Sequence, residues 1–121
     1  MQNTVTIGKQ AEQYAYQLLL QQGLQIIEQN WYCRQGEIDL IAQTNDTLIF
    51  IEVRYRTRSD YGNGAESVHY HKRRKIISCA RYYIHTHPAV EKCMIRFDVF
   101  SMSRDSAGEF SSHWIQDAFQ T

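Results

Sequence analysis

The sequence is short of cysteine and has no long apolar run, and these absences limit the class of protein. Its three cysteines, Cys33, Cys79 and Cys93, are an odd number and form no CxxC pair. They therefore predict reduced thiols rather than a disulfide or zinc framework. No apolar run is long enough to span a bilayer, and the N-terminal residues lack the apolar core of a signal peptide. We therefore expect a cytoplasmic protein with no membrane partner.

The chain also lacks an excess of either charge, because 13 Lys and Arg balance 13 Asp and Glu. This balance argues against a generally basic nucleic-acid binder. The bases are nevertheless concentrated between Arg54 and Arg81, where eight of them stand against two acids and give a local charge of +6. Such asymmetry indicates a polyanion partner, and the alternative is a solvated basic helix face. The candidate nucleic-acid contacts in this region are Arg56, Arg58, Lys72, Arg73, Arg74 and Lys75.

A chain of 121 residues with 43% hydrophobic residues is the size and composition of one globular domain. We find no internal repeat or interdomain linker, so we expect a single domain over residues 1–121. Helical and strand periodicities alternate along the chain in the order α-β-β-β-α-β, with a further terminal strand. The predicted helices span residues 4–22 and 67–87, and the predicted strands span residues 24–31, 36–44, 47–54, 94–102 and 111–115.

Residues 36–54, GEIDLIAQTNDTLIFIEVR, predict a hairpin of two strands. Polar and apolar residues alternate in both halves, which places each set on one face of its strand. The Asn and Asp at 45–46 tolerate the backbone angles of a tight turn. A two-residue turn there pairs positions whose numbers sum to 91, so we expect Asp39 to lie opposite Glu52.

Two facing carboxylates point to a metal site. Like charges that oppose each other directly on a sheet are destabilising unless something neutralises them, and hard divalent cations bind carboxylate oxygens. The same register places Glu37 opposite Arg54. The alternative is therefore a solvated polar face that carries one Glu37–Arg54 salt bridge, and the pattern alone does not decide between the two.

The hairpin resembles the signature of the PD-(D/E)xK nucleases. In this chain the acid Asp39 is followed, after a dozen residues, by the acid Glu52 and, two positions later, the base Arg54. More closely, the chain resembles the bacterial YraN family of small proteins, which are related to Holliday junction resolvases. The matching segments follow the same order along nearly the whole chain: GKQAE at 8–12, NWYCRQGEIDLIA at 30–42, IFIEVRYR at 49–56, SVHYHK at 67–72, RFDV at 96–99 and WIQDAF at 114–119.

This resemblance implies a restriction-endonuclease-like domain of the α/β (α+β) class, with an αβββαβ core and a mixed central sheet flanked by helices. It also implies that Asp39 and Glu52 are metal-binding acids. Glu12 matches an acid of the first helix that joins the same centre, although by its helical pattern alone it is an ordinary carboxylate. Glu37 matches the first acid of the GEID motif and is expected beside the metal ligands.

The chain departs from the superfamily at Arg54, which stands where a lysine is usual, and this leaves catalytic competence open. Arginine stays charged in proteins and therefore cannot act as a base. It can still stabilise charge on a phosphate. Lys72 matches a lysine position of the family and is the candidate for the missing amine.

The activity implied by the resemblance is hydrolysis of DNA phosphodiesters, including those of branched DNA, with Mg²⁺ or Mn²⁺ as cofactor. The alternatives are a catalytically inactive nucleic-acid-binding module of the same fold and a structural domain with no nucleic-acid role. Resolvases are usually two-fold dimers that match two-fold substrates, so we also expect a homodimer.

Overall fold

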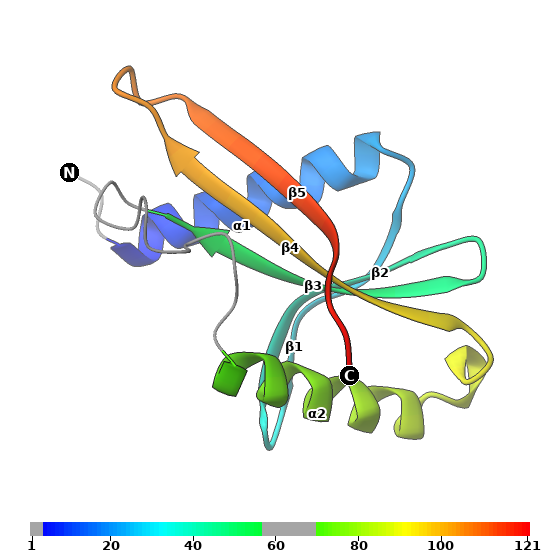
Figure 1. The fold of residues 1–121 in the computed structure, drawn as a ribbon. Helices are drawn as coiled ribbons and strands as arrows, with labels where there is room; N and C mark the ends of the chain where they lie inside the picture. The colour runs from blue at the N-terminus through cyan, green and yellow to red at the C-terminus, as the bar shows by residue number, and fades with distance from the viewer. Residues whose placement is uncertain (1–3, 57–69) are drawn as a thin grey trace.

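The computed structural model describes residues 4–56 and 70–121. Two helices cover a single sheet of five strands, and Figure 1 shows them on its opposite faces. In chain order the elements are α1 (Thr4–Gln21), β1 (Gln25–Cys33), β2 (Gly36–Thr44), β3 (Thr47–Tyr55), α2 (Tyr70–Thr86), the short 3-10 helix η2 (Pro88–Val90), β4 (Met94–Arg104) and β5 (Phe110–Phe119).

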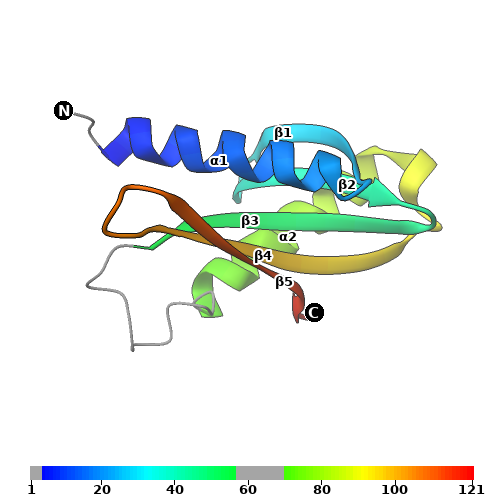
Figure 2. The same cartoon turned by 90° about the horizontal axis from the view of Figure 1, so that it is seen from above.

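The strands lie in the order β1-β2-β3-β4-β5, and all neighbours are antiparallel except β3 and β4. The first three strands form a meander, and α2 carries the chain to a fourth strand that runs parallel to the third (Figure 2). This is the mixed α/β (α+β) arrangement that the sequence predicts. Among the described helices, none is both long and apolar enough to cross a bilayer.

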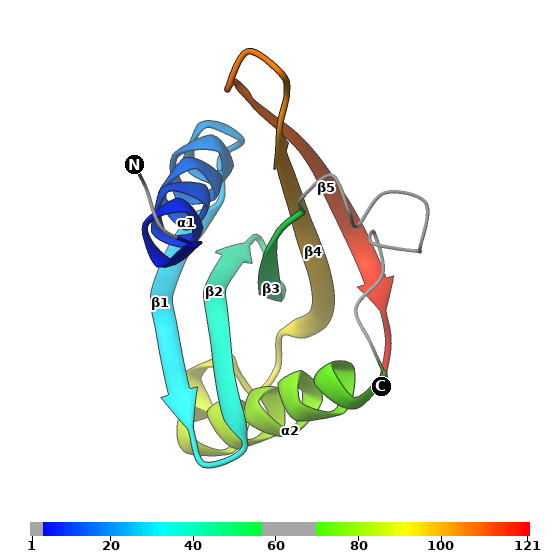
Figure 3. The same ribbon diagram turned by 90° about the vertical axis from the view of Figure 1, so that its left-hand side faces the viewer.

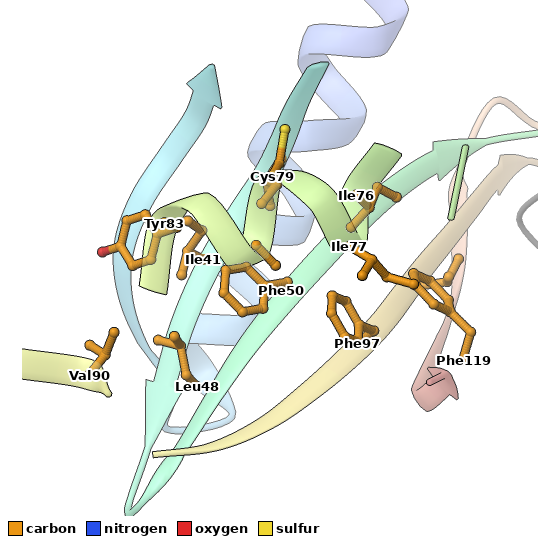
Figure 4. Close-up of a cluster of buried hydrophobic side chains, with 13 residues drawn as sticks. Ile41, Leu48, Phe50, Ile76, Ile77, Cys79, Tyr83, Val90, Phe97 and Phe119 are labelled. Atoms are coloured by element: carbon orange, nitrogen blue, oxygen red, sulfur yellow. The ribbon is translucent and has the colours of Figure 1, made fainter. Parts of the chain in front are cut away.

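Alternation along β3 separates the core into two layers. Leu48 and Phe50 pack with α2, whereas Ile49 and Ile51 pack with α1. All four are almost completely buried, as expected for a central strand covered on both faces. In the layer beneath α2, the rings of Phe50 and Phe97 stack with their centroids 5.6 Å apart (Figure 4).

The hairpin turn and the end of α1 are as predicted. Thr44 pairs with Thr47, so the paired numbers sum to 91, and Asn45 adopts a positive φ of 51° in the turn. Gly23 ends α1 with a φ of 91°, and its N–H donates to the carbonyl of Leu20 at 3.0 Å.

The final strand is longer than predicted. It continues to Phe119, which is buried and stacks on Phe97 with centroids 5.0 Å apart. The fully buried carboxylate of Asp98 explains the extension. It accepts hydrogen bonds from the Trp114 indole and the Asp117 backbone N–H, which hold the end of β5 against β4.

The prediction of reduced thiols is wrong for two of the three cysteines. Cys33, at the end of β1, forms a disulfide with Cys79 of α2, and Cys93 is free. The two bonded residues are 46 positions apart, and the sequence contains no motif that links them. Their proximity is a product of tertiary packing, because α2 runs past the end of the sheet where β1 turns into β2 (Figure 3).

Candidate active site

An open pocket of about 370 Å³ lies where α1, α2 and the first three strands meet. It contains every carboxylate that the sequence proposes for the site. The pocket is lined by Glu12 of α1, Glu37 and Asp39 of β2, Glu52 of β3 and Lys72 of α2, together with Gly8, Lys9, Ala11, Asn30, Tyr32, Val53 and Tyr55.

Asp39 lies at the position where the ladder between β2 and β3 stops. Leu40 and Ile51 are the last paired residues, so Asp39 and Glu52 lie one step beyond the ladder rather than within it. The Asp39 carboxylate instead accepts the backbone N–H of Val53 at 2.8 Å. On the β2 side, Ile38 packs with the α2 layer and Leu40 with the α1 layer, so the predicted simple alternation breaks at Asp39.

Burial and, after it, the charge of Glu52 raise the pKa of Asp39 to about 8. The hydrogen bond from the Val53 N–H favours the ionised form but does not offset these two effects. A buried carboxyl group with a pKa shifted this far, in a pocket that it shares with other acids, is a candidate for a functional site. A cation that entered this pocket would therefore be stabilised there.

Glu12 reaches the pocket because of the way α1 packs on the sheet. Ala11 and Ala15 lie on its buried stripe, so the helix approaches the sheet closely and Glu12 stands at the edge of the contact. Burial raises the pKa of Glu12, and the charges of Glu37 and Glu52 act in the same direction, whereas a hydrogen bond with the Asp39 side chain lowers it.

Lys72 is a cation in direct contact with one of these acids, Glu52. Its Nζ lies 2.6 Å from Oε1 of Glu52, which is buried. Burial lowers the pKa of Lys72, but the charge of Glu52 and the hydrogen bond to it outweigh burial, so the pKa is raised overall. Lys72 is therefore a charged donor that holds Glu52, not a neutral amine.

The acids share one pocket but do not form a ready-made ligand set. Among residues 4–56 and 70–121, no three His, Cys, Asp or Glu side chains are arranged to hold one metal ion together. Glu52 is neutralised by Lys72, and Glu12 hydrogen-bonds to Asp39. The structure thus brings the three predicted ligands together without assembling them around a single point.

The remaining predicted bases lie around the pocket at different depths. Arg54 is half-buried on β3, and its charge lowers the pKa of Lys72, which places the two cations near each other. Lys75 lines an adjoining pocket of about 480 Å³ that shares Glu37 and Lys72 with the first. Arg56 and Arg73 are half-buried, and Arg74 is exposed. Arg58 lies outside the described residues.

Sequence reasoning missed two residues of β1 that line the pocket, Asn30 and Tyr32. Tyr32 lies directly opposite Glu37 in the ladder between β1 and β2. Asn30 has a positive φ of 48°, a conformation that asparagine tolerates better than most residues. The available signal was the register of this second hairpin, which pairs the end of β1 with the GEID motif.

Comparison with known proteins matches most of the chain to one family. The model of the uncharacterised protein family UPF0102 matches residues 11–102, a span that contains all five charged residues lining the pocket from Glu12 to Lys72. A UPF0102 protein of Alcanivorax borkumensis is 45% identical over 112 residues, which cover 93% of this chain and 90% of that protein. One from Psychromonas ingrahamii is 47% identical over 113 residues, which cover 93% and 88%. One from Stutzerimonas stutzeri is 36% identical over the full length of both.

Proposed function

The chain belongs to the UPF0102 family, and we propose that it is a metal-dependent endonuclease that hydrolyses DNA phosphodiesters, including those of branched DNA. One observation carries the proposal. Four carboxylates from three separate elements line one pocket, and burial and the charge of Glu52 raise the pKa of Asp39 among them to about 8. Buried acids that destabilise one another are retained where their charge has a use.

The residues present fit a hard divalent cation. Asp39, Glu52 and Glu12 offer only carboxylate oxygens, which are the ligands that Mg²⁺ and Mn²⁺ prefer. We propose that these three acids hold the ion and that it replaces the proton that Asp39 otherwise keeps. When bound, the ion would lower the pKa of a water ligand and stabilise charge on the phosphate.

Two basic residues, Lys72 in the pocket and Arg54 near it, would act on the phosphate and the attacking water. Lys72 stays protonated, so it can donate to a phosphate oxygen or orient the attacking water but cannot accept the water's proton. Arg54 keeps its five donors and its charge at any working pH, and we propose that it stabilises negative charge on the scissile phosphate. We further expect a cytoplasmic homodimer, since a two-fold junction matches a two-fold protein.

The chemistry of Arg54 and Lys72 also favours a second function. Arg54 replaces the usual lysine, and Lys72 is tied to Glu52 at 2.6 Å, so neither offers a free amine. A module that binds nucleic acid without cutting it would retain this pocket and the basic residues of α2. Such a module would bind DNA in a salt-sensitive manner and leave it intact.

The test is incubation with end-labelled linear duplex, single-stranded, flapped and four-way-junction DNA in Mg²⁺, Mn²⁺ or EDTA. We expect cleavage of at least one substrate with a divalent ion, and no cleavage in EDTA. The matched control is Asp39→Asn, whose amide can still accept the Val53 N–H but carries no charge. Cleavage that persists in EDTA or in this variant would contradict the proposal, and binding without cleavage would favour the second function.

A further inference from the structure

Tyr32 is an aromatic residue that lies open to solvent at the rim of the acidic pocket. It is 70% exposed, whereas its neighbours on either side in the strand are half-buried. It lies on β1, an edge strand of the sheet, so no further strand of the described chain covers that side. An exposed ring alone needs no explanation, but this one lines the same pocket as Asp39 and Glu52.

The backbone on both sides of Tyr32 is fixed. Trp31 packs edge-on against Tyr83 of α2, with ring centroids 5.2 Å apart, and Cys33 is bonded to Cys79 of the same helix. Both neighbours belong to the α2 layer of the core. Strand alternation then turns Tyr32 to the opposite side, toward the pocket. The backbone that carries the ring is therefore held in place, while the side chain remains exposed.

The environment of Tyr32 selects the chemistry of a partner. Its hydroxyl hydrogen-bonds to Glu37, which lies directly opposite in the ladder. The charge of Glu37 is the main cause that raises the pKa of the phenol, so it stays neutral. The Glu37 carboxylate beside the hydroxyl also disfavours an anionic phosphate against the ring itself. An open ring face among carboxylates therefore suits an uncharged, flat group.

We propose that Tyr32 stacks on a nucleobase that adjoins the phosphodiester in the pocket. This inference rests on the proposed nuclease function and narrows its substrate class. Bases within a continuous duplex are already stacked on their neighbours, whereas an unpaired base offers a free face to an aromatic side chain. The site therefore prefers strands with unpaired bases at the cleavage point, such as single strands, flaps and branch points, over continuous duplex.

The test compares the affinity of the protein for a fluorescein-labelled single strand and for the blunt duplex of the same sequence, by anisotropy in EDTA. Without a divalent ion the measurement is independent of cleavage. The variants are Tyr32→Ala and Tyr32→Phe, and Tyr82→Ala is the matched control. Tyr82 is also a half-exposed aromatic residue, but it lies on α2 and does not line the pocket.

We expect Tyr32→Ala to weaken single-strand binding by roughly 5- to 150-fold, the range for removal of one base–aromatic stack. Its affinity for duplex should not change. Tyr32→Phe keeps the ring and should bind both DNAs like the wild type, as should Tyr82→Ala. A 2-aminopurine base at the stacking position should be quenched by the wild type and by Tyr32→Phe but not by Tyr32→Ala.

Two results would overturn the inference alone: a Tyr32→Ala protein that binds single strands like the wild type, or one that loses affinity equally for both DNAs. In either case a wild type that still cleaves DNA would leave the nuclease function standing. A wild type that neither binds nor cleaves any DNA would overturn the inference and the nuclease function together.

Discussion

Asp39 is a buried carboxyl group whose pKa differs between the folded protein and the unfolded chain. Its ordinary pKa is 3.8, whereas burial and the charge of Glu52 raise its pKa in the folded protein to about 8. Between these two values the unfolded chain ionises freely and the folded protein keeps the proton. The contribution of Asp39 to the free energy of unfolding is therefore greatest below about pH 4, and it falls as the pH rises toward about 8.

This difference predicts the stability of an Asp39→Asn variant. The amide can accept the Val53 N–H but does not ionise, so the free energy of unfolding should fall less with pH than in the wild type. The variant should be the more stable of the two at about pH 8. Urea denaturation of both proteins without metal, from about pH 4 to about pH 8, measures the free energy of unfolding and its dependence on pH. Parallel pH profiles for the two proteins would show that Asp39 is not the titrating group.

Arg54 stands where the nuclease signature that the sequence resembles usually has a lysine. We predict that it stabilises and positions charge and does not accept a proton. Losing such a donor typically costs about 2.7–4 kcal/mol of transition-state stabilisation, or roughly 100- to 1000-fold in rate. Arg54→Ala should lose cleavage on this scale and keep metal binding, and Arg54→Lys should retain or raise activity. Rate measurements that show no difference between Arg54→Ala and wild type would remove Arg54 from the site.

At the scale of elements, α2 presents its bases in two directions. Lys72 enters the acidic pocket, whereas Arg73 and Arg74 do not line it. One guanidinium, that of Arg73, lies over the ring of Tyr70 at 6.0 Å. If the proposed function is correct, the solvent-facing bases of α2 would hold a nucleic-acid backbone next to the pocket.

We predict that binding to DNA is dominated by phosphates and weakens steeply with salt. Each phosphate neutralised on duplex DNA contributes about −0.9 to the slope of log affinity against log salt. Replacing both Arg73 and Arg74 with alanine should therefore flatten that slope by about 0.9 for each phosphate that the two side chains neutralise. Lys92→Ala is the control, because Lys92 is an exposed base outside α2. An affinity that does not depend on salt would dismiss the polyanion interpretation.

Local signals predicted most of the elements, and tertiary contacts decided what the sequence could not predict. The turn at Asn45 and the end of α1 at Gly23 are short-range features with their own backbone chemistry, so both were predicted correctly. The break of alternation at Asp39 depends on a bond to a residue 14 positions away. The Cys33–Cys79 disulfide depends on helix packing, which no local motif records.

At the scale of the whole molecule, the site exists only because both layers meet at one end of the sheet. The hairpin predicts that Asp39 and Glu52 are close, but α1 must bring Glu12 and α2 must bring Lys72. The helical pattern of α1 says that Glu12 borders the buried stripe and does not say which end of the sheet it reaches. Its place in the site was therefore predicted from the family resemblance alone.

The central claim is that Asp39, Glu52 and Glu12 bind one divalent ion, and calorimetric titration with Mn²⁺ tests it most directly. The wild type should release or absorb heat with a stoichiometry of one ion, and an Asp39→Ala/Glu52→Ala double variant should show no such binding. Glu91→Ala, which removes an exposed acid of another region, should bind like the wild type. Equal binding of Mn²⁺ by the wild type and the double variant would contradict the metal site.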